Sequence, residues 1–541
     1  MKEMNMKKAF FLLLLALIFP VLSSCNKEAP DEGDEEGDRL HVCEFNIEAP
    51  KPKYIKTRAN CLQRTEYYYS CSCGKAGTES FEYGDFGGHS GYVSKAEEKY
   101  LVKEATVKTS AIYYKSCSRC GKASTDTFVY GTPIELTEEQ KQYMPTSVTV
   151  SLFDTEASSY GFTYNSLSMP IDPVIQIKRV GDTEWSEYSP SSYESTTRDP
   201  DGNQISYFIS KAEITLSPDT SYVYRVCDKG MDVATPEVTL RTGNARTDSF
   251  TFSHVSDSQA GPREFGWVMG AIMGKSDFAL HTGDVVQYAH KEYEWTEMLD
   301  GNYKSVMGMP IMAMAGNHET SYNNATFETA KHFNNKIPTQ SSLALGYYYS
   351  FIYGDVKFIM LNTNDLESDR LKAEQYNWLI NELENNTCKW TIVSMHNPMY
   401  SVGKYGADET RNSIALALRD QLMGVFAEYG VDLVLQAHDH AVSRTFPLDA
   451  NGSATVENIS TEGGVDYIVD PSGVIYVMNG PAGTQGRAPV AIEDGIYAYA
   501  EAGRKASWAD ITVDGDTLTV TVKWHDGSSE HVYHTWGIKK S

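Results

Sequence analysis

The sequence predicts an α/β protein in which a large layered domain follows an all-β domain and a small cysteine-rich module. From about residue 247, apolar strands alternate with loops and helices, and several strands end in Asp, Asn or His. Residues 146–243 instead show short alternating strands and turns, as in "SVTVSLF" and "VIQIKRV". Residues 41–140 contain a repeated cysteine motif. These three patterns predict three folded parts.

The chain length and charge narrow the classes of function. With 541 residues, the chain is long enough for several domains and at least one large core. The formal net charge is −25, so we expect a solvated acidic surface. Nucleic acid is not expected as a partner, because binding phosphates requires clustered Lys and Arg. The sequence leaves the oligomeric state open.

The N-terminus predicts export. Residues 1–24 have a basic start and an apolar run that is too short for a membrane span, which is typical of a signal peptide. The ending "VLSSC" resembles a bacterial lipobox, with Cys25 as the lipidated residue; an ordinary signal peptide cut nearby is the alternative. Residues 25–40 are acidic and poor in apolar residues, which predicts a disordered tether. We therefore expect a protein lipid-anchored to the bacterial outer membrane, periplasmic or on the cell surface.

The cysteine-rich module is a two-copy repeat. "YYYSCSCGKAGTESFEYG" matches "YYKSCSRCGKASTDTFVYG", and the second copy has the metal-knuckle spacing Cys117-x-x-Cys120. We expect structural zinc in the first copy, held by His41, Cys61, Cys71 and Cys73. The second copy offers only His89, Cys117 and Cys120. Disulfides, natural in an exported protein, are the alternative, and Cys43 leaves the pairing open. The module has no visible catalytic role.

Residues 146–243 predict a scaffold of two packed sheets. The stretch "LSPDTSYVYRV" resembles a fibronectin type III strand with its preceding turn. Its alternating Tyr222, Tyr224 and Val226 place one face on a core, and we expect Cys227 to be a buried thiol.

Five strand ends beyond residue 247 carry the chemistry. They are "FTFSHVSDSQ" with Asp257, "FALHTGDVVQY" with Asp284, "PIMAMAGNHE" with Asn317 and His318, "WTIVSMHNPMYS" with His396, and "VDLVLQAHDHAVSRT" with His438 and His440. Taken singly, each is more often a cap or a satisfied polar residue. Together they form a mixed oxygen and nitrogen donor set without thiols, which suits hard and borderline metals. The Asp284 carboxylate can bridge two ions. Two ions suit attack on phosphorus, because they bind phosphoryl oxygens and lower the pKa of a bound water.

These five blocks, in this order, resemble the calcineurin-like metallophosphoesterase superfamily and, within it, the purple acid phosphatases. "YYYSFIYGDVKFIMLNTN", "QYNWLINEL" and the preceding fibronectin-like domain share the resemblance, which covers residue 146 to the C-terminus. It implies a four-layer α/β/β/α domain with a two-sheet core at residues 247–541. The tail, with its Asp514-Gly515 turn, would supply closing strands.

The resemblance also implies an activity. We expect a dinuclear-metal hydrolase of small phosphate esters, using a metal-activated hydroxide and iron with zinc, manganese or a second iron. Phosphomonoesters are favoured over diesters or nucleotides. A non-catalytic surface binding protein is the other alternative, and the retention of every core ligand weighs against it.

The implied roles fall on matching positions. Asp257, Asp284 and His440 would hold the first metal, and Asp284, Asn317, His396 and His438 the second. His318 would contact the phosphate and assist protonation of the leaving group, so His318 and Asp284 are the expected catalytic residues. Asp439, between two ligands, could orient them.

The sequence departs from the purple acid phosphatases at several positions. Their metal-binding tyrosine lies three residues after the bridging aspartate; here Gln287 stands there, and Tyr288 is the candidate ligand one residue later. Gln259 replaces a glycine and could offer an amide oxygen. The histidines after the fourth block are replaced by "SVGKYGADETRN", whose candidate substrate contacts are Lys404, Tyr405 and Arg411. The glycine-rich "MNGPAGTQG" lacks a Walker ending and is expected to be a turn beside the site.

Overall fold

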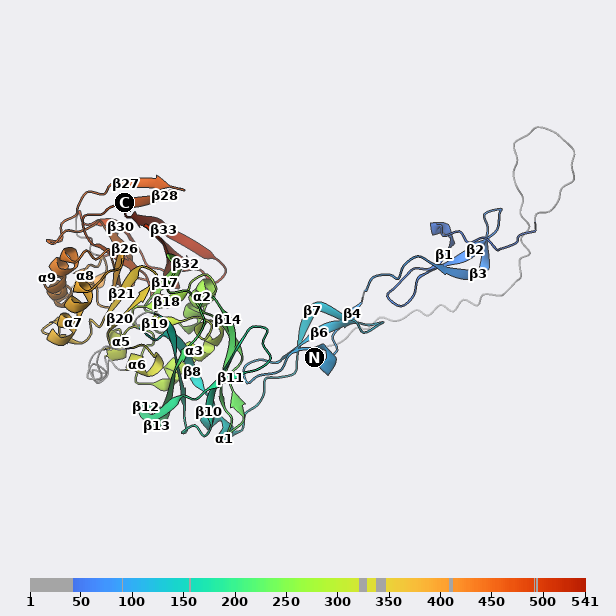
Figure 1. Ribbon diagram of the computed structural model, residues 1–541, viewed down its shortest axis with the longest axis horizontal. Helices are drawn as coiled ribbons and strands as arrows, with labels where there is room; N and C mark the ends of the chain where they lie inside the picture. Colours follow the sequence, from blue (N-terminus) through green and yellow to red (C-terminus); the bar gives the residue numbers. More distant parts are fainter. Residues whose placement is uncertain are drawn as a thin grey trace, which may run out of the picture. The chain divides into compact units, whose positions relative to one another are not determined.

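The computed structural model describes most of the chain after its N-terminal segment. The described residues are 42–89, 91–154, 157–320, 328–336, 347–407, 412–490, 492 and 495–541. The expected signal peptide, acidic tether, Cys25, His41 and Arg411 lie outside them. The chain divides into two compact units, with the boundary in the sequence between Ile134 and Glu135, and each unit is described by itself (Figure 1). Among the described residues, no helix has the length and apolar character needed to cross a membrane.

The first unit contains two copies of one small β-motif, as the sequence repeat predicts. Each copy has a short 3-10 helix, a short strand and a hairpin, and the second copy adds a two-residue strand. The elements are η1 (Pro52–Tyr54), β1 (Ile55–Thr57), β2 (Thr65–Ser70), β3 (Ala76–Tyr83), β4 (Tyr92–Val93), η2 (Glu98–Tyr100), β5 (Leu101–Lys103), β6 (Ala111–Cys117) and β7 (Ala123–Tyr130).

The hairpin turns of the two copies are built alike. Gly74 and Gly121 follow the second knuckle cysteine of each copy with φ of +84° and +73°, a region that glycine enters without strain. The hydroxyl of Tyr54 donates to the carbonyl of Gly74 at 3.0 Å, and Tyr100 donates to Gly121 at 2.5 Å. Each turn is therefore fixed by its own 3-10 helix.

The expected zinc ligand set of the first copy is corrected by the structure. Cys61 does not join Cys71 and Cys73; it lies with His89, Cys117 and Cys120. The physical reason is that Cys61 sits in the loop between β1 and β2, at the end of the hairpin opposite the β2–β3 knuckle that carries Cys71. Cys43, which the sequence left unassigned, joins Cys71 and Cys73 instead.

The second unit begins with two packed sheets. A short helix, α1 (Glu138–Tyr143), starts with a capping box between Thr137 and Gln140. One sheet has the order β12-β13-β9-β8, and the other contains β11, β10, β14, β15 and β16. The strands are β8 (Thr146–Leu152), β9 (Ser159–Ser166), β10 (Pro173–Arg179), β11 (Ser186–Tyr188), β12 (Ser191–Arg198), β13 (Gln204–Thr215), β14 (Ser221–Asp228), β15 (Val233–Ala234) and β16 (Val238–Arg241). Tyr222, Tyr224, Val226 and the Cys227 thiol are buried, as expected.

The large domain has two sheets. An eight-stranded sheet has the order β19-β18-β17-β31-β32-β33-β28-β27, and a seven-stranded sheet has the order β20-β21-β24-β25-β29-β26-β30. Their strands are β17 (Ser249–Val255), β18 (Phe278–His281), β19 (Ile311–Ala313), β20 (Tyr349–Tyr353), β21 (Val356–Leu361), β24 (Trp390–Met395), β25 (Leu433–Gln436), β26 (Val442–Thr445), β27 (Ile459–Glu462), β28 (Val465–Val469), β29 (Ile475–Asn479), β30 (Tyr497–Glu501), β31 (Ser507–Asp514), β32 (Thr517–His525) and β33 (Glu530–Lys539).

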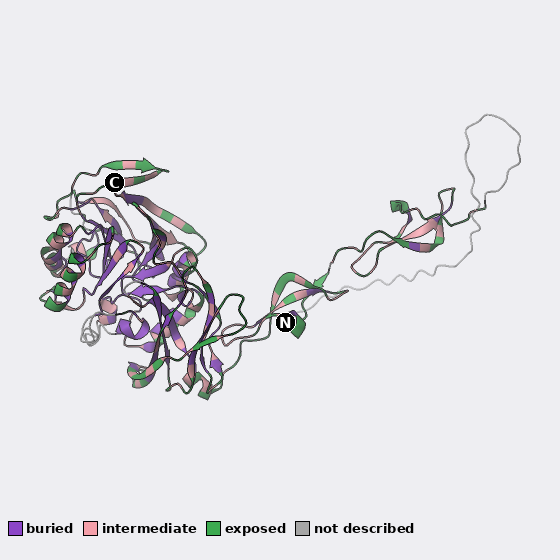
Figure 2. Cartoon of the chain, in the orientation of Figure 1, coloured by how far each residue is buried: buried purple, intermediate pink, exposed green. Residues whose placement is uncertain are grey.

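Helices cover the outer face of each sheet. The helices of this domain are α2 (Pro262–Ile272), α3 (Glu292–Gly301), α4 (Tyr303–Val306), α5 (Asn317–Thr320), α6 (Glu328–His332), α7 (Ala373–Glu384), α8 (Lys404–Ala407) and α9 (Asn412–Glu428), and a small hairpin is formed by β22 (Leu366–Glu367) and β23 (Arg370–Leu371). One apolar cluster fills the space between the sheets, a second lies under α2 and α3, and a third lies under α7 and α9 (purple in Figure 2). These layers confirm the predicted α/β/β/α fold. The tail supplies β31 to β33, with Gly515 at φ +54° in the predicted turn.

The strands that position the site are parallel and adjacent. In the first sheet, Val255 pairs with His281 and His281 pairs with Ala313; in the second, Ser394 pairs with Leu435. Because the carboxyl ends of β17, β18 and β19, and those of β24 and β25, are level, the residues that follow them emerge at one edge of each sheet.

The sandwich and the large domain share a buried polar joint. Glu292, at the start of α3, accepts hydrogen bonds from Ser147 Oγ at 2.9 Å and from Asn165 Nδ2 at 2.8 Å. His332 Nε2 lies 2.8 Å from the other Glu292 oxygen. The main core also includes sandwich residues such as Tyr224, so the two parts form one packed unit.

Candidate metal centre

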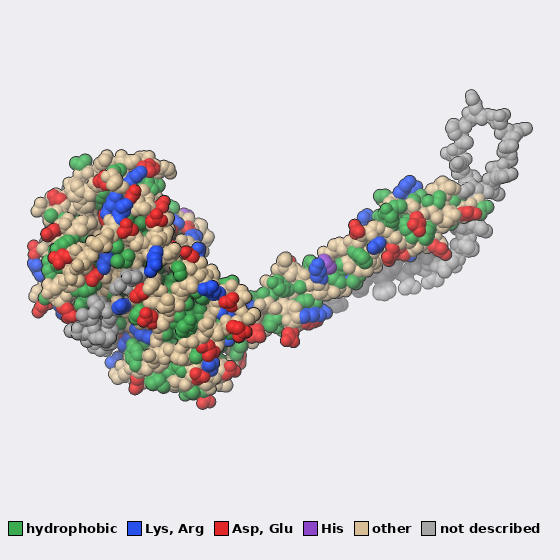
Figure 3. Space-filling view, in the orientation of Figure 1, with side chains coloured by type: hydrophobic (Ala, Val, Ile, Leu, Met, Phe, Trp, Pro, Cys, Tyr) green, Lys and Arg blue, Asp and Glu red, His purple; other side chains and the backbone are tan. Residues whose placement is uncertain are grey.

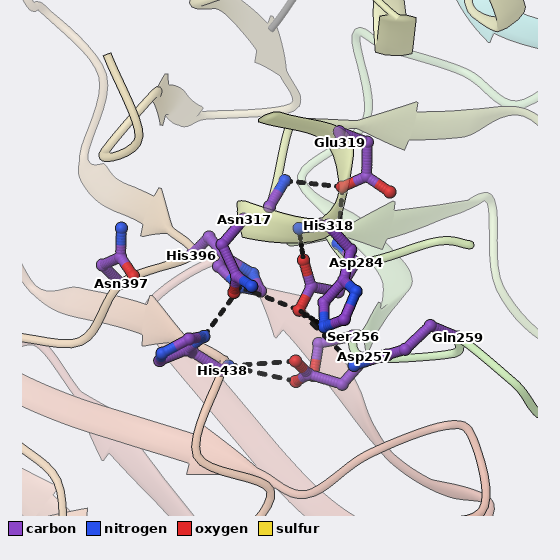
Figure 4. A network of polar contacts seen from close by, with 12 residues as sticks. Ser256, Asp257, Gln259, Asp284, Asn317, His318, Glu319, His396, Asn397 and His438 are labelled. Atoms are coloured by element: carbon purple, nitrogen blue, oxygen red, sulfur yellow. Dashed lines mark hydrogen bonds and ion pairs between the residues drawn. The ribbon is translucent and has the colours of Figure 1, made fainter. Parts of the chain in front are cut away.

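All five predicted strand ends meet in one place (Figure 4). Asp257 follows β17, Asp284 follows β18, Asn317 begins α5 after β19, His396 follows β24, and His438 and His440 follow β25. The two aspartates and three of these histidines (His396, His438 and His440) are buried, whereas Asn317 and His318 are half-buried. The predicted ligand set is therefore brought together from both sheets, and its open side lies at Asn317 and His318.

The contacts of His396 show that several potential ligand atoms converge on its Nε2. His396 Nδ1 lies 2.8 Å from the carbonyl oxygen of Thr282, which can only accept, so Nδ1 carries the hydrogen. Nε2 lies 3.0 Å from Asn317 Oδ1, 3.2 Å from His438 Nδ1 and 3.2 Å from Asp284 Oδ2. A cation among these atoms turns a set of acceptor contacts into ligand bonds.

A second group of donors lies around Asp257. His440 Nε2 is 3.3 Å from Asp257 Oδ1, and its Nδ1 donates to the carbonyl of Gln485 at 2.5 Å. The side-chain nitrogen of Gln259 lies 3.4 Å from Asp284 Oδ2 and 3.5 Å from His440 Nε2. Gln259 Oε1 is buried and has no protein hydrogen-bond partner. The donors and this orphaned oxygen fit a second cation next to Asp284, as the sequence predicts.

Four of the ligand candidates have strained backbones. Asp257, Asp284, His438 and His440 have φ of +51°, +57°, +75° and +54°. Non-glycine residues rarely occupy this left-handed region, and such strain persists where surrounding contacts enforce it. The backbone N–H of His438 donates to both Asp257 oxygens, at 3.1 and 3.2 Å, which holds the two loops together.

Burial and charge set the protonation states. Burial raises the pKa of Asp284, but His396 lowers it further, so the carboxyl group stays ionised. Burial lowers the pKa of His438 to about 3, which keeps that imidazole neutral. Burial also lowers the pKa of His396, while Asp284 and Asp257 raise it, to about 9 on balance. A proton and a metal ion therefore compete for His396.

Glu319 is a supporting residue that the sequence reasoning missed. It is buried, and one carboxylate oxygen accepts the N–H groups of Asp284 at 2.8 Å and Gly316 at 2.7 Å, while the other accepts that of Val285 at 2.9 Å. The carboxylate therefore ties the loop after β18 to the loop after β19. The signal was present in "GNHE", but nothing in the sequence gave its acidic residue a partner.

Glycines allow these two loops to approach each other closely. A side chain at Gly283 would place Cβ 2.5 Å from the backbone nitrogen of Gly316, and one at Gly316 would place it 2.2 Å from Asp284 Oδ1. Both distances are shorter than van der Waals contact, so only glycine fits at either position.

His318 faces the site with one nitrogen. Its Nδ1 lies 2.9 Å from the carbonyl oxygen of Gln287, so Nδ1 carries the hydrogen. Nε2 lies 3.8 Å from Asp284 Oδ2, and the side chain is 25% exposed. His318 is thus placed beside the donors with a nitrogen that can exchange a proton with a bound molecule.

Asp439, which the sequence suggested could orient the two ligands beside it, bonds to the loop that follows β24. It accepts a hydrogen bond from Ser401 Oγ and, at 3.0 Å, from the backbone N–H groups of Lys404 and Tyr405. It therefore positions the loop of residues 401–405. The Tyr405 ring packs on His438 with centroids 3.9 Å apart.

A cavity of about 270 Å³ opens beside His438. Its lining includes Asp369, Asn397, Tyr405, Ile414 and His438. Tyr405, a predicted substrate contact, is thus placed at the site. Lys404 is exposed, and Arg411 lies outside the described residues.

Tyr288, the candidate metal ligand, lies at the surface. Its side chain is 46% exposed, and its ring lies 4.3 Å from Lys291 Nζ. The position before it points inward: the amide nitrogen of Gln287 lies 3.1 Å from His318 Nδ1. The glycine-rich stretch is a turn beside the site, as expected, since the N–H of Gly483 donates to the carbonyl of Asp257 at 3.0 Å.

Known proteins resemble this chain in sequence. Residues 250–442 match the family model described as Calcineurin-like phosphoesterase. An uncharacterised protein of Mycobacterium tuberculosis is 28% identical over 316 residues, which cover 51% of this chain and 58% of that protein. Acid phosphatase type 7 of Homo sapiens is 28% identical over 233 residues, which cover 40% of this chain and 50% of the human protein.

A solved structure resembles most of this chain in fold. The purple acid phosphatase from yellow lupin (Lupinus luteus) seeds superposes with a TM-score of 0.60 at 15% identity, covering 80% of each chain. The chain therefore has a region, residues 250–442, that matches the calcineurin-like phosphoesterase domain, and it resembles the solved structure in fold. Its relatives include acid phosphatases, and this chain spans only about half to three-fifths of the length of the relatives named above.

Proposed function

We propose that this protein hydrolyses small phosphate esters, monoesters in preference to diesters, at a centre of two metal ions. One observation carries the proposal: Asn317 Oδ1, His438 Nδ1 and Asp284 Oδ2 all lie within 3.2 Å of His396 Nε2. Relatives named as acid phosphatases support the choice of monoesters.

The residues divide into two ligand sets around a shared carboxylate. Asp257, Asp284 and His440 would hold one ion, and Asp284, Asn317, His396 and His438 the other. Iron paired with zinc, manganese or a second iron suits these oxygen and nitrogen donors. When bound, the ions would supply a nucleophile from water at neutral pH and offset charge on the phosphoryl oxygens.

The chain's own groups would handle the substrate. His318, with Nδ1–H held by the Gln287 carbonyl, would use Nε2 to contact the phosphate and pass a proton to the leaving oxygen. The cavity beside Tyr405 and Asn397 would receive the organic part of the ester. Asp439 would keep Tyr405 in place by holding its backbone.

We also propose that the protein is exported and anchored to the bacterial outer membrane through a lipid on Cys25, facing the periplasm or the outside. The sequence of residues 1–25 supports this. Metabolic labelling with a fatty acid tests it: label is expected in the wild-type protein and not in Cys25→Ser, and label in both would contradict it.

The activity is tested by comparing an aryl phosphate monoester with the matching diester, using metal-loaded wild type, Asn317→Ala and His438→Ala. We expect faster monoester hydrolysis in the wild type and a fall of at least roughly 100-fold in both variants. Faster diester hydrolysis would favour a phosphodiesterase or nucleotide hydrolase instead. Metal-loaded protein that cleaves neither ester would favour a surface binding protein.

A further inference from the structure

A second donor cluster lies in the first unit, remote in sequence from the phosphoesterase residues. Cys61, His89, Cys117 and Cys120 place one ligand atom each within 4.8 Å of one another. Cys61 Sγ lies 3.6 Å from Cys117 Sγ, and Cys120 Sγ lies 3.2 Å from His89 Nδ1. These are four donors of the kinds that make closed, tetrahedral zinc sites.

The distances fit a metal site better than a disulfide. Sulfur atoms bonded at about 2.3 Å to one tetrahedral zinc ion lie about 3.8 Å apart, whereas a disulfide brings them to about 2.05 Å. The spacing of 3.6 Å between Cys61 and Cys117 is close to the first value. His89 as the fourth member has no place in a disulfide but is a common zinc ligand.

The cluster takes its members from both repeats. Cys117 and Cys120 form the knuckle of the second copy, and His89 precedes that copy. Cys61 lies in the β1–β2 loop of the first copy, 56 residues before Cys117. A metal ion held by all four would therefore join the two copies, which otherwise have separate sheets.

Aligning the two repeats shows that His89 has a counterpart cysteine in the first copy, whereas Cys61 has no counterpart cysteine in the second. Cys43 precedes Cys73 by 30 residues, and His89 precedes Cys120 by 31; the difference is the residue deleted from the first knuckle. Cys43 is thus the first copy's counterpart of His89. Cys61, by contrast, has Val107 as its counterpart, ten residues before the knuckle.

We propose that one zinc ion binds Cys61, His89, Cys117 and Cys120 and ties the first repeat to the second. In this scheme each repeat supplies its own knuckle and preceding ligand, and its loop cysteine serves the repeat that follows. The second copy needs no loop cysteine, because the chain continues into α1 and the sandwich, and Val107 stands there. In the first copy, the described residues offer three ligands, Cys43, Cys71 and Cys73.

The test is chemical protection of cysteines in the full-length, zinc-loaded protein. A thiol-alkylating reagent is applied before and after chelation, and modified peptides are identified by mass spectrometry. We expect Cys117 and Cys120 to be protected in the wild type and exposed by chelation. Cys61→Ser should remove their protection and lower the zinc released by a thiol-binding mercurial by about one ion per chain.

Three variants separate this scheme from others. Cys71→Ser, in the first knuckle, should leave Cys61 protected together with Cys117 and Cys120, whereas Cys61 would become reactive if it belonged to the first copy's site. Cys388→Ser, in the second unit, is the control for cysteine replacement and should change nothing. Val107→Cys should add no zinc, because no third knuckle follows.

Phosphate ester hydrolysis provides the check on folding, since none of these residues belongs to the phosphoesterase domain's ligand set. It should be equal in wild type and Cys61→Ser. A disulfide between Cys61 and Cys117 in the unreduced protein, or unchanged protection in Cys61→Ser, would overturn the proposal. Because the readouts are zinc and alkylation, they stand apart from whether the enzyme proposal holds.

Discussion

Backbone carbonyl groups decide which histidine nitrogens face the donor cluster. His318, His396 and His440 each place Nδ1 against a carbonyl oxygen, of Gln287, Thr282 and Gln485, so each presents Nε2 inward. His438 is the exception and turns Nδ1 toward His396. Fixing one nitrogen of an imidazole sets its tautomer and its angle, and so prepares a ligand before any ion binds.

Replacing His318 should separate proton transfer from metal binding. His318→Gln keeps a polar side chain but cannot donate a proton, so we expect kcat to fall by about 10²–10⁴ for an alkyl phosphate. For a nitrophenyl phosphate, whose leaving group needs no proton, the fall should be much smaller. Metal content, measured by elemental analysis, should not change. Equal losses on both substrates would contradict the proton-donor role.

For single residues, the sequence indicated the candidate metal ligands but not the residues that position them. Asp257, Asp284 and the histidines were predictable because polar residues at the ends of buried strands have little other reason to be there. Glu319 was missed because its partners are backbone N–H groups, which only the folded loops bring together. Tyr288 is exposed, and its neighbour Gln287 contacts His318 instead, because a shift of one residue after β18 decides which side chain points inward.

Among the secondary-structure elements, the strands β17, β18 and β19 of one sheet and β24 and β25 of the other must end at the same height for the site to form. The close contact of Gly283 with Gly316 lets the loops after β18 and β19 lie side by side, and Glu319 then bonds to both. A strand shifted by one residue would turn Asp284 away from His396. The glycines are therefore as necessary to the site as the ligands.

Gly316→Ala tests this contact. Its Cβ would meet Asp284 Oδ1 at 2.2 Å, so we expect Asp284 to be displaced and activity to fall at least ~100-fold with loss of bound metal. Gly270→Ala, within α2, is the matched control, because a Cβ there meets nothing within 4 Å. That variant should keep full activity and gain about 0.5–1 kcal/mol of stability. Similar behaviour of the two variants would refute the packing argument.

For the whole molecule, the sandwich is part of the structure that supports the site. Glu292 and His332, both in the large domain, are buried against Ser147 and Asn165 of the sandwich. Lys211 of β13 crosses the same joint and donates to the carbonyl of Phe333 at 3.2 Å and to that of Ala330.

Acidic and basic side chains are interspersed on the face shown in Figure 3, so the net charge is not gathered at one place there.

Lys211 gives the joint a measurable pH dependence. Desolvation lowers the pKa of Lys211 from 10.5 to about 8, so between these values the unfolded chain binds more protons than the folded chain. Stability contributed by Lys211 should therefore rise as pH increases from about 8 to 10.5, by at most about 3 kcal/mol. Urea unfolding of wild type and Lys211→Met across this range measures the difference, with the exposed Lys304→Met as control. A constant difference between wild type and Lys211→Met would contradict the assignment.

Most of the fold could be predicted from the sequence, because apolar strand patterns and polar residues at the ends of strands are local signals. The sandwich joint was not, since Glu292 and Asn165 are 127 residues apart and neither is unusual in its own segment. The predicted zinc ligand set of the first repeat was wrong for a related reason. The spacing suggested that Cys61 belongs with the cysteines of its own repeat, whereas the fold places it beside those of the second repeat.

The central claim is that five strand ends hold two metal ions around Asp284, and anomalous diffraction from crystals of the manganese-loaded protein tests it most directly. The account predicts two anomalous peaks about 3.5–4 Å apart. One should lie among Asp257, Asp284 and His440, and the other among Asp284, Asn317, His396 and His438. A single peak, or no peak at these residues, would contradict it.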